Sequence, residues 1–191
     1  MEESFSLTKR ERIETARLVL RRPLPSDAEA IFTLYASDPE VTRYLSWPTH
    51  RTVEDTRAFL AWSDGEWERW PAGPYLVLWR EGGHPLGSTG LAFQSPEHAA
   101  TGYAFARFEW GHGYATESLQ AMVDLAPHLG VLQLGSICHV DHRVSAHVLE
   151  KCGFQCLGIR REDTEFPNLA PGRKSDVLCY VRTFSDRSRE R

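Results

Sequence analysis

Residues 110–117, which read WGHGYATE, end one expected strand and open one expected helix. Glycines at such a junction let the backbone approach a ligand closely. The free N–H groups in the first turn of a helix, with the positive end of its dipole, favour a phosphate or pyrophosphate. A plain tight turn uses glycines too, so this segment indicates an anion site only if other segments support it.

The sequence before this segment predicts a strand, two helices and a meander. Residues 15–22 (TARLVLRR) alternate in part and stop at prolines, as a first strand does. The next helix has Ser26 as its N-cap, with Glu29 placed as in a capping box. A second helix starts at Thr52, and Asp55 completes its capping box. An antiparallel meander follows, with expected strands at residues 75–80, 86–93 and 100–108.

The sequence after this segment predicts alternating helices and strands. In order, we expect helix, strand, helix, strand and strand over residues 115–129, 132–140, 144–151, 154–165 and 176–184. No linker or repeat divides the chain. We therefore predict one α+β domain over residues 1–191, with a core at about 13–184 and flexible termini.

Composition narrows the class of protein. The 191 residues are 41% hydrophobic and 25% charged, and no apolar run approaches the roughly 20 residues that a membrane span needs. The first residues are acidic and do not resemble a secretory signal, so we expect a cytoplasmic protein. A net charge of −4 supplies no broad positive field for nucleic acid. The four cysteines lack CxxC spacing, which favours reduced, structural thiols at Cys138, Cys152, Cys156 and Cys179.

A second segment supports the first. Residues 139–154 read HVDHRVSAHVLEKCGF. With this pair of motifs the chain resembles the GNAT superfamily of acetyltransferases, in particular the branch similar to ribosomal-protein N-terminal acetyltransferases, which carries "WGxGYATE", "NxxS" and "EKxGF". The resemblance spans residues 15–184 and includes the TxRLxLR opening and Gly102-Tyr103 in the meander.

The resemblance implies a fold and a cosubstrate. It implies a mostly antiparallel mixed sheet, flanked by helices, that splays apart between the strand ending near Phe108 and the strand beginning near Leu132. Acetyl-CoA would lie in this gap and give its acetyl group to a primary amine, either a protein N-terminus or a small molecule. Pantetheine would pair with Ala106, Arg107 and Phe108, and the pyrophosphate would lie on Gly111, His112, Gly113, Tyr114, Ala115 and Thr116.

The resemblance also implies two catalytic residues. The "NxxS" serine matches Ser145, which would donate a proton to the departing thiolate; a serine near a helix start also serves as a plain cap. The general base matches Glu165, although the loop alignment leaves Glu162 and Asp163 open and a solvated carboxylate is the ordinary alternative. Such acid and base groups each contribute about 10² to 10⁴ in rate.

Two positions depart from the family pattern. His142 replaces the usual asparagine; it can still form hydrogen bonds to the cofactor, but it titrates near neutrality. Ala100 stands where many relatives have a glutamate before "GY". A CoA-binding module without catalysis is therefore the alternative function. A metal site at His139, Asp141, His142 and His147 is not expected, because their spacing does not converge clearly.

The acceptor is the least determined part of the prediction. Its pocket would be walled by helices of residues 36–70 and by the loop of residues 166–174, which supply aromatic side chains and Arg43, Arg51 and Arg173. An aromatic and basic mouth suits an acidic or amphipathic acceptor. We interpret each tryptophan of this region as core or partly covered surface: Trp47, Trp62, Trp67 and Trp70. Nothing in the sequence specifies an interface, so a homodimer stays open.

Overall fold

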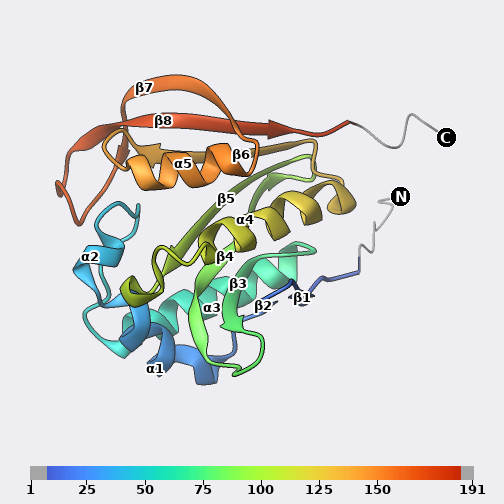
Figure 1. The fold of residues 1–191 in the computed structure, drawn as a ribbon. Coiled ribbons are helices and arrows are strands. Elements are labelled where there is room, and N and C mark those ends of the chain that lie inside the picture. The colour runs from blue at the N-terminus through green and yellow to red at the C-terminus, as the bar shows by residue number, and fades with distance from the viewer. Residues whose placement is uncertain (1–7, 186–191) are drawn as a thin grey trace.

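The computed structural model describes residues 8–185, so that residues 1–7 and 186–191 of the predicted flexible termini lie outside this range. Within it, eight strands form one sheet (Figure 1). In spatial order these are β1 (Arg12–Glu14), β2 (Leu18–Arg21), β3 (Pro74–Trp79), β4 (Pro85–Ser95), β5 (His98–Phe105), β6 (Gln133–His139), β8 (Lys174–Thr183) and β7 (Gln155–Glu165). Every neighbouring pair is antiparallel except β5 and β6, which are parallel. The predicted α+β class, with a mixed and mostly antiparallel sheet, is confirmed.

The parallel pair is short, and this splays the sheet. Among the described residues, β5 and β6 pair only over His98–Ala100 and Gln133–Gly135. The Ser136 hydroxyl then donates to the Thr101 carbonyl at 2.9 Å. Beyond that point β5 stays paired with β4 and β6 with β8, so the two strands separate. The predicted splay is therefore confirmed.

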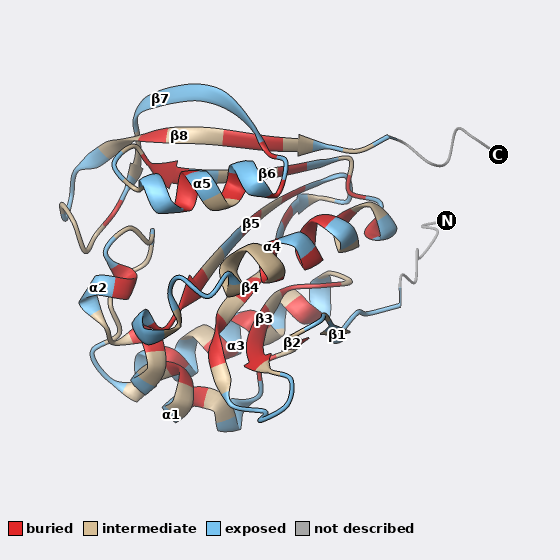
Figure 2. Ribbon diagram, viewed as in Figure 1, coloured by how far each residue is buried: buried red, intermediate tan, exposed pale blue. Residues whose placement is uncertain are grey.

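Helices cover both faces of the sheet (Figure 1). They are α1 (Ala28–Ile31), which continues as a π-helical turn over Phe32–Ala36, then α2 (Pro39–Thr42), α3 (Val53–Arg69), α4 (Tyr114–Leu125) and α5 (Arg143–Lys151). Side chains of a strand alternate between faces, and in β2 both faces are buried. Leu18 and Leu20 pack in a cluster with Met122 of α4, whereas Val19 packs in another with Ile31 of α1. Figure 2 shows this buried interior and the exposed ribbon of β7.

One predicted helix cap is wrong and another is confirmed. Ser26 lies inside a 3-10 turn, and the neighbouring Asp27 takes the capping role because its carboxylate accepts from the Leu24 N–H and from Arg21, each at 2.7 Å. At α3, the Asp55 carboxylate accepts from the Thr52 N–H at 3.0 Å, which completes the predicted capping box.

The meander strand expected to reach residue 108 ends earlier, at Phe105. The Glu109 N–H donates to the Ala106 carbonyl at 2.9 Å, and this bond closes a 3-10 turn. The Trp110 indole donates to the Phe105 carbonyl at 2.8 Å and folds the turn back on the strand. The chain therefore leaves the sheet three residues earlier than its hydrophobic pattern predicts.

Candidate active site

The glycine turn opens α4 as the sequence predicts. Gly111 and Gly113 have φ values of 80° and 81°, in the left-handed region that favours glycine, and Gly113 is the N-cap of α4. The N–H groups of the first helical turn, at Tyr114, Ala115 and Thr116, have no intrahelical acceptor. They form a concentrated set of donors for an anion.

A hydrogen-bond network that the sequence analysis missed ties this turn to the start of β2. The Glu117 carboxylate accepts from the Thr15 hydroxyl at 2.6 Å, from the Arg17 N–H at 2.8 Å and from Arg17 Nε at 2.7 Å. The Arg17 guanidinium also donates to the His112 carbonyl at 3.0 Å and lies 4.7 Å from the centre of the Tyr114 ring. Burial raises the pKa of Glu117, but the bonds from Thr15 and Arg17 outweigh burial and hold it below its usual value. Thr15 and Arg17 of the TxRLxLR opening and Glu117, the last residue of WGHGYATE, are thus joined in one hydrogen-bond network.

A cleft of about 1330 Å³ follows the gap where β5 and β6 part. Its sheet-side wall comes from the unpaired part of β5, from β6 and from the start of α5. These residues are Thr101, Gly102, Tyr103, Ala104, Ser136, Ile137, Cys138, His142 and Ser145. The free strand edge in the cleft lies upstream of residues 106–108, which were predicted to hold pantetheine. Ala106 is fully buried and its N–H already donates to the Leu86 carbonyl at 2.9 Å, while Phe108 is 68% exposed.

Ser145 lies in this cleft beside a tyrosine. Its side chain is 9% exposed, and its Oγ lies 2.9 Å from the Tyr103 hydroxyl. The same tyrosine hydroxyl is 3.2 Å from the Ser145 carbonyl, to which it donates. Burial raises the pKa of Tyr103, so the phenol stays protonated at neutral pH. The family pattern includes Tyr103 only as the second residue of "GY" and does not predict a role for it. The contact between Tyr103 and Ser145 forms because α5 packs over β5.

His142 lies on the same side of the cleft, at the N-cap of α5. Its ring stacks on Tyr44, with 4.6 Å between the centroids and 22° between the planes. Burial and the neighbouring His139 lower the pKa of His142. His139 itself is buried, and its Nδ1 accepts from the Asp141 N–H at 3.1 Å. A neutral imidazole thus faces the cleft at the position of the family asparagine.

The three carboxylates considered as a base lie on the β7–β8 hairpin. Glu165 is exposed and accepts from the Gly172 N–H at 2.8 Å. The Glu162 N–H donates to Asp176 at 3.0 Å, and Asp163 accepts from Arg160 at 3.2 Å. None of the three lines the cleft, and over residues 8–185 the only carboxylate that does so is Asp55. The structure therefore brings Ser145 and His142 together but not Ser145 and Glu165.

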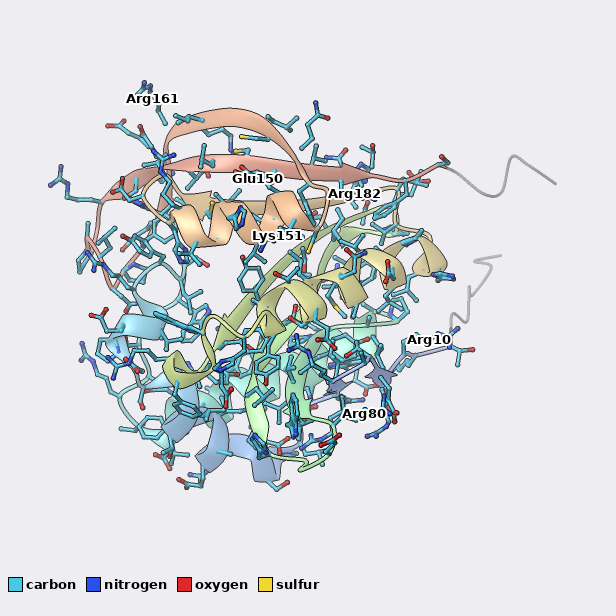
Figure 3. The ribbon with its side chains drawn as sticks, viewed as in Figure 1. Arg10, Arg80, Glu150, Lys151, Arg161 and Arg182 are labelled. Atoms are coloured by element: carbon cyan, nitrogen blue, oxygen red, sulfur yellow. The ribbon has the colours of Figure 1, made fainter. Side chains whose placement is uncertain are left out.

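The opposite wall of the cleft is aromatic and basic, as predicted. The lining side chains here are Tyr44, Trp47, His50, Arg51, Phe59, Trp62, Arg160 and Phe166. Trp67 is fully buried, as the interpretation of the tryptophans expects, whereas Trp47 and Trp62 face the cleft. Arg43 and Arg173 do not line it. Arg160 is exposed and lines the cleft, while its neighbour Arg161 does not line it and extends into solvent (Figure 3).

Asn168 stabilises this wall by hydrogen bonds that the sequence analysis did not predict. Its amide nitrogen donates to the carbonyls of Thr42 and Trp47, each at 2.8 Å. Its amide oxygen accepts from the N–H and the hydroxyl of Thr49, at 2.8 and 3.0 Å. These bonds join the segment after α2 to the loop between β7 and β8, which lie side by side in Figure 1. This wall, which the sequence analysis assigned to the acceptor, is therefore pre-organised by contacts between residues far apart in sequence.

A second hollow, of about 930 Å³, adjoins the glycine turn on the side of β1. Gly113 and Thr116 line its inner end. Its basic side chains are Arg10, Arg12, Arg17, His128 and Lys151; Arg10 and Lys151 are labelled in Figure 3. Acidic side chains, including Asp124, lie among them, so the hollow has mixed charge with a basic excess.

Within residues 8–185, no three His, Cys, Asp or Glu side chains gather in a way that could hold a metal ion. No helix in the described part of the chain is both long and apolar enough to cross a membrane.

Comparison with known proteins defines the class. A family model described as acetyltransferase (GNAT) domain matches residues 17–155, well over half of the chain. The chain therefore belongs to the GNAT acetyltransferase family, and it is an acyltransferase. Among curated proteins it is similar to the uncharacterized N-acetyltransferase YoaA of Bacillus subtilis (strain 168), with 28% identity over 153 residues, which cover 78% of this chain and 86% of that protein.

Solved structures share the fold. RimL, a ribosomal L7/L12 α-N-protein acetyltransferase in complex with coenzyme A, aligns with a TM-score of 0.79 at 24% identity, over 91% of this chain and 98% of that one. The microcin C7 self-immunity acetyltransferase MccE, in complex with acetyl-CoA and AMP, aligns with a TM-score of 0.79 at 17% identity, over 89% and 94%. At these identities the likeness shows the GNAT fold alone.

Proposed function

We propose that this chain transfers an acetyl group from acetyl-CoA to a primary amine, by direct attack of the amine on the thioester. The observation that carries the proposal is the Ser145–Tyr103 hydroxyl pair, at 2.9 Å, inside the gap where β5 and β6 part. This pair supports a proton donor in the cleft, and the first turn of α4 offers N–H donors that suit the pyrophosphate. The acceptor is a protein N-terminal α-amine or a small-molecule amine.

In this proposal acetyl-CoA lies along the free edge of β5. The backbone there, near Thr101–Ala104, is not paired to β6 and can pair with the pantetheine amides. The 3-10 turn of Arg107 and Phe108 connects β5 to the glycine turn, and residues 111–116 receive the pyrophosphate. The basic side chains of the second hollow suit the remaining phosphate charge. The structural neighbours RimL and MccE, named as complexes with CoA and acetyl-CoA, support this choice of substrate.

Ser145 is the proposed proton donor to the departing CoA thiolate. The hydrogen bond with Tyr103 orients its hydroxyl and keeps a second proton nearby. Glu165, at the end of β7, is the base that the family resemblance suggests. To act on an amine in the cleft, its carboxylate must leave the Gly172 N–H or work through water.

The second candidate function is a CoA-binding module without catalysis. Two observations favour it: the family asparagine is His142, and the cleft position that often carries a glutamate is Ala100. Both functions require CoA binding, but only the enzyme needs the Ser145 hydroxyl.

The test is to incubate the protein with acetyl-CoA and a panel of peptides and small amines while measuring free thiol. The enzyme predicts turnover with at least one acceptor. Ser145→Ala should lower kcat about 10²-fold with the KM for acetyl-CoA nearly unchanged. Ser95→Ala is the matched control, because its hydroxyl contacts His98 outside the cleft. CoA binding without turnover for any acceptor would instead support the module.

A further inference from the structure

We propose that His142 accepts the proton from the attacking amine. This inference rests on the acetyl transfer proposed above and names a catalytic group for it. The cleft has few bases: among the lining residues that the structure describes, Asp55 supplies the one carboxylate.

The other two bases in the cleft already form hydrogen bonds within the fold. The Asp55 carboxylate caps α3 by accepting from the N–H groups of Arg51 and Thr52, at 2.8 and 3.0 Å. His50 lies on the acceptor wall, where its Nδ1 is 2.8 Å from the Thr56 hydroxyl. By contrast, no hydrogen bond of the described residues involves a ring nitrogen of His142. Its imidazole remains available to a ligand in the cleft.

The position of His142 fits the reaction. It precedes Ser145 by three residues at the start of α5, and residues with this spacing lie on one face of a helix. Both side chains line the cleft. Stacking against Tyr44 covers one face of the imidazole and leaves both ring nitrogens, which lie on its edge, free of that contact. A proton acceptor and a proton donor thus lie one helical turn apart beside the gap.

The charges around His142 favour the neutral ring. His139 on β6 and the surrounding burial lower the pKa of His142 below its ordinary value of 6.5. The nearest carboxylate given for this cluster is that of Asp141, which lies 3.7 Å from His139 Nδ1. On the α2 side, Tyr44 presents its ring to His142, and the Arg43 guanidinium is 5.4 Å from the centre of that ring. At pH 7 the imidazole is therefore an unprotonated base.

The proposed step balances as follows. The amine nitrogen forms a bond to the thioester carbonyl carbon, and the carbon–sulfur bond breaks with its electron pair on sulfur. One amine proton passes to the free ring nitrogen of His142. The thiolate takes a proton through the Ser145 hydroxyl, and the imidazolium returns its proton by the same hydroxyl or by water. The products are the amide and the CoA thiol.

The experiment compares His142→Asn, which restores the family residue, with the wild type over pH 5 to 9, using an acceptor found in the amine panel. His147→Gln is the matched control, since His147 is exposed on the same helix and does not line the cleft. We expect His142→Asn to lower kcat about 10²-fold at pH 7 with an acetyl-CoA KM within about threefold of wild type. The wild-type rate should fall as pH drops through the pKa of His142, because the protonated ring cannot accept a proton. The pH–rate profile of the variant should lack this fall at low pH, its acid limb.

The outcomes distinguish failure of the His142 assignment from failure of the proposed acetyl transfer. If the wild type turns over and His142→Asn keeps kcat within about threefold and the same acid limb, His142 is not the base although the enzyme stands. If instead Glu165→Gln removes the acid limb, the hairpin carboxylate is the base. If the wild type acetylates no amine, the proposed function falls and this inference with it. Thermal melting of each variant confirms that it is folded.

Discussion

Replacing Glu117 tests whether the network beneath the glycine turn stabilises the fold and shapes the cofactor site together. Glu117→Ala removes three hydrogen bonds, to the Thr15 hydroxyl and to two nitrogens of Arg17. Glu117→Gln keeps an oxygen for the two bonds that Oε1 accepts, but it presents an amide nitrogen toward Arg17 Nε. The two variants therefore separate loss of the whole network from loss of its charged bond.

The magnitude follows from the exposure of the two partners. A hydrogen bond to a charged group contributes about 1.5–3 kcal/mol when shielded. The Arg17 side chain is 41% exposed and that of Glu117 is 17% exposed, so solvent reduces this range. We expect Glu117→Ala to lower the free energy of unfolding by about 3 kcal/mol and Glu117→Gln by about 1–2 kcal/mol. At about 2–4 °C per kcal/mol, the alanine variant should lose about 6–12 °C in Tm.

The pH dependence adds a second readout. The pKa of Glu117 is lowered in the folded state, so its ionised form stabilises the fold above the unfolded value of about 4.3. That contribution is lost as pH falls through the folded pKa. The stability gap between wild type and Glu117→Gln should therefore narrow below about pH 4.

Urea and thermal unfolding at pH 7 and at about pH 3 measure the stability, and calorimetry at pH 7 measures the Kd for CoA. Glu29→Gln is the control, because its ion pair with Arg57 spans 3.3 Å and its side chain is 71% exposed; we expect no measurable change. We expect Glu117→Ala also to weaken CoA binding about 3- to 10-fold, since the turn is held by the network. A Tm within about 2 °C of wild type, or unchanged CoA affinity, refutes this role.

Four further predictions concern the glycine turn, the aromatic wall, the Tyr103 hydroxyl and the extent of the domain. Gly113→Ala should cost about 1–2 kcal/mol and weaken CoA binding because its φ is 81°, whereas Gly65→Ala, inside α3 with open space around its Cβ, should be neutral or stabilising. Asn168→Ala should raise the KM for the amine and leave that for acetyl-CoA unchanged, because it loosens only the acceptor wall; equal changes in both values would contradict this. Tyr103→Phe should lower kcat without changing Tm greatly, and steady-state kinetics at pH 7 checks it. Limited proteolysis should leave one fragment close to residues 13–184, as expected if the chain is one domain.

Local sequence chemistry predicted the elements whose boundaries are local. Gly113 opens α4 and Gly153, with φ of 73°, closes α5, because each position requires a conformation that glycine adopts readily. Thr52 and Asp55 mark the start of α3 because their capping bonds span only three residues. The first helix was harder to predict, since Asp27 caps it while also binding Arg21 of the preceding strand.

Predictions failed or fell short where the packing of a side chain decides the outcome. The meander strand ends at Phe105 because Trp110 folds back on its carbonyl, and hydrophobic pattern alone continues the strand. The aromatic wall was anticipated as a region, but Trp47 and Trp62 line the cleft while Trp67 is core, a difference that helical spacing does not encode. The assignment of Glu165 as the base stays a prediction.

The sequence by itself determined the family and the order of the elements, because glycine turns, caps and alternation act over a few residues. The place of Ser145 beside Tyr103, of His142 on Tyr44, and of Asn168 across two loops was decided only by the tertiary structure. Each of these contacts joins residues that become neighbours only when α5 and the β7–β8 hairpin pack onto a splayed sheet. The glycine turn is thus encoded locally, whereas the geometry of the cleft depends on the packing of the whole fold.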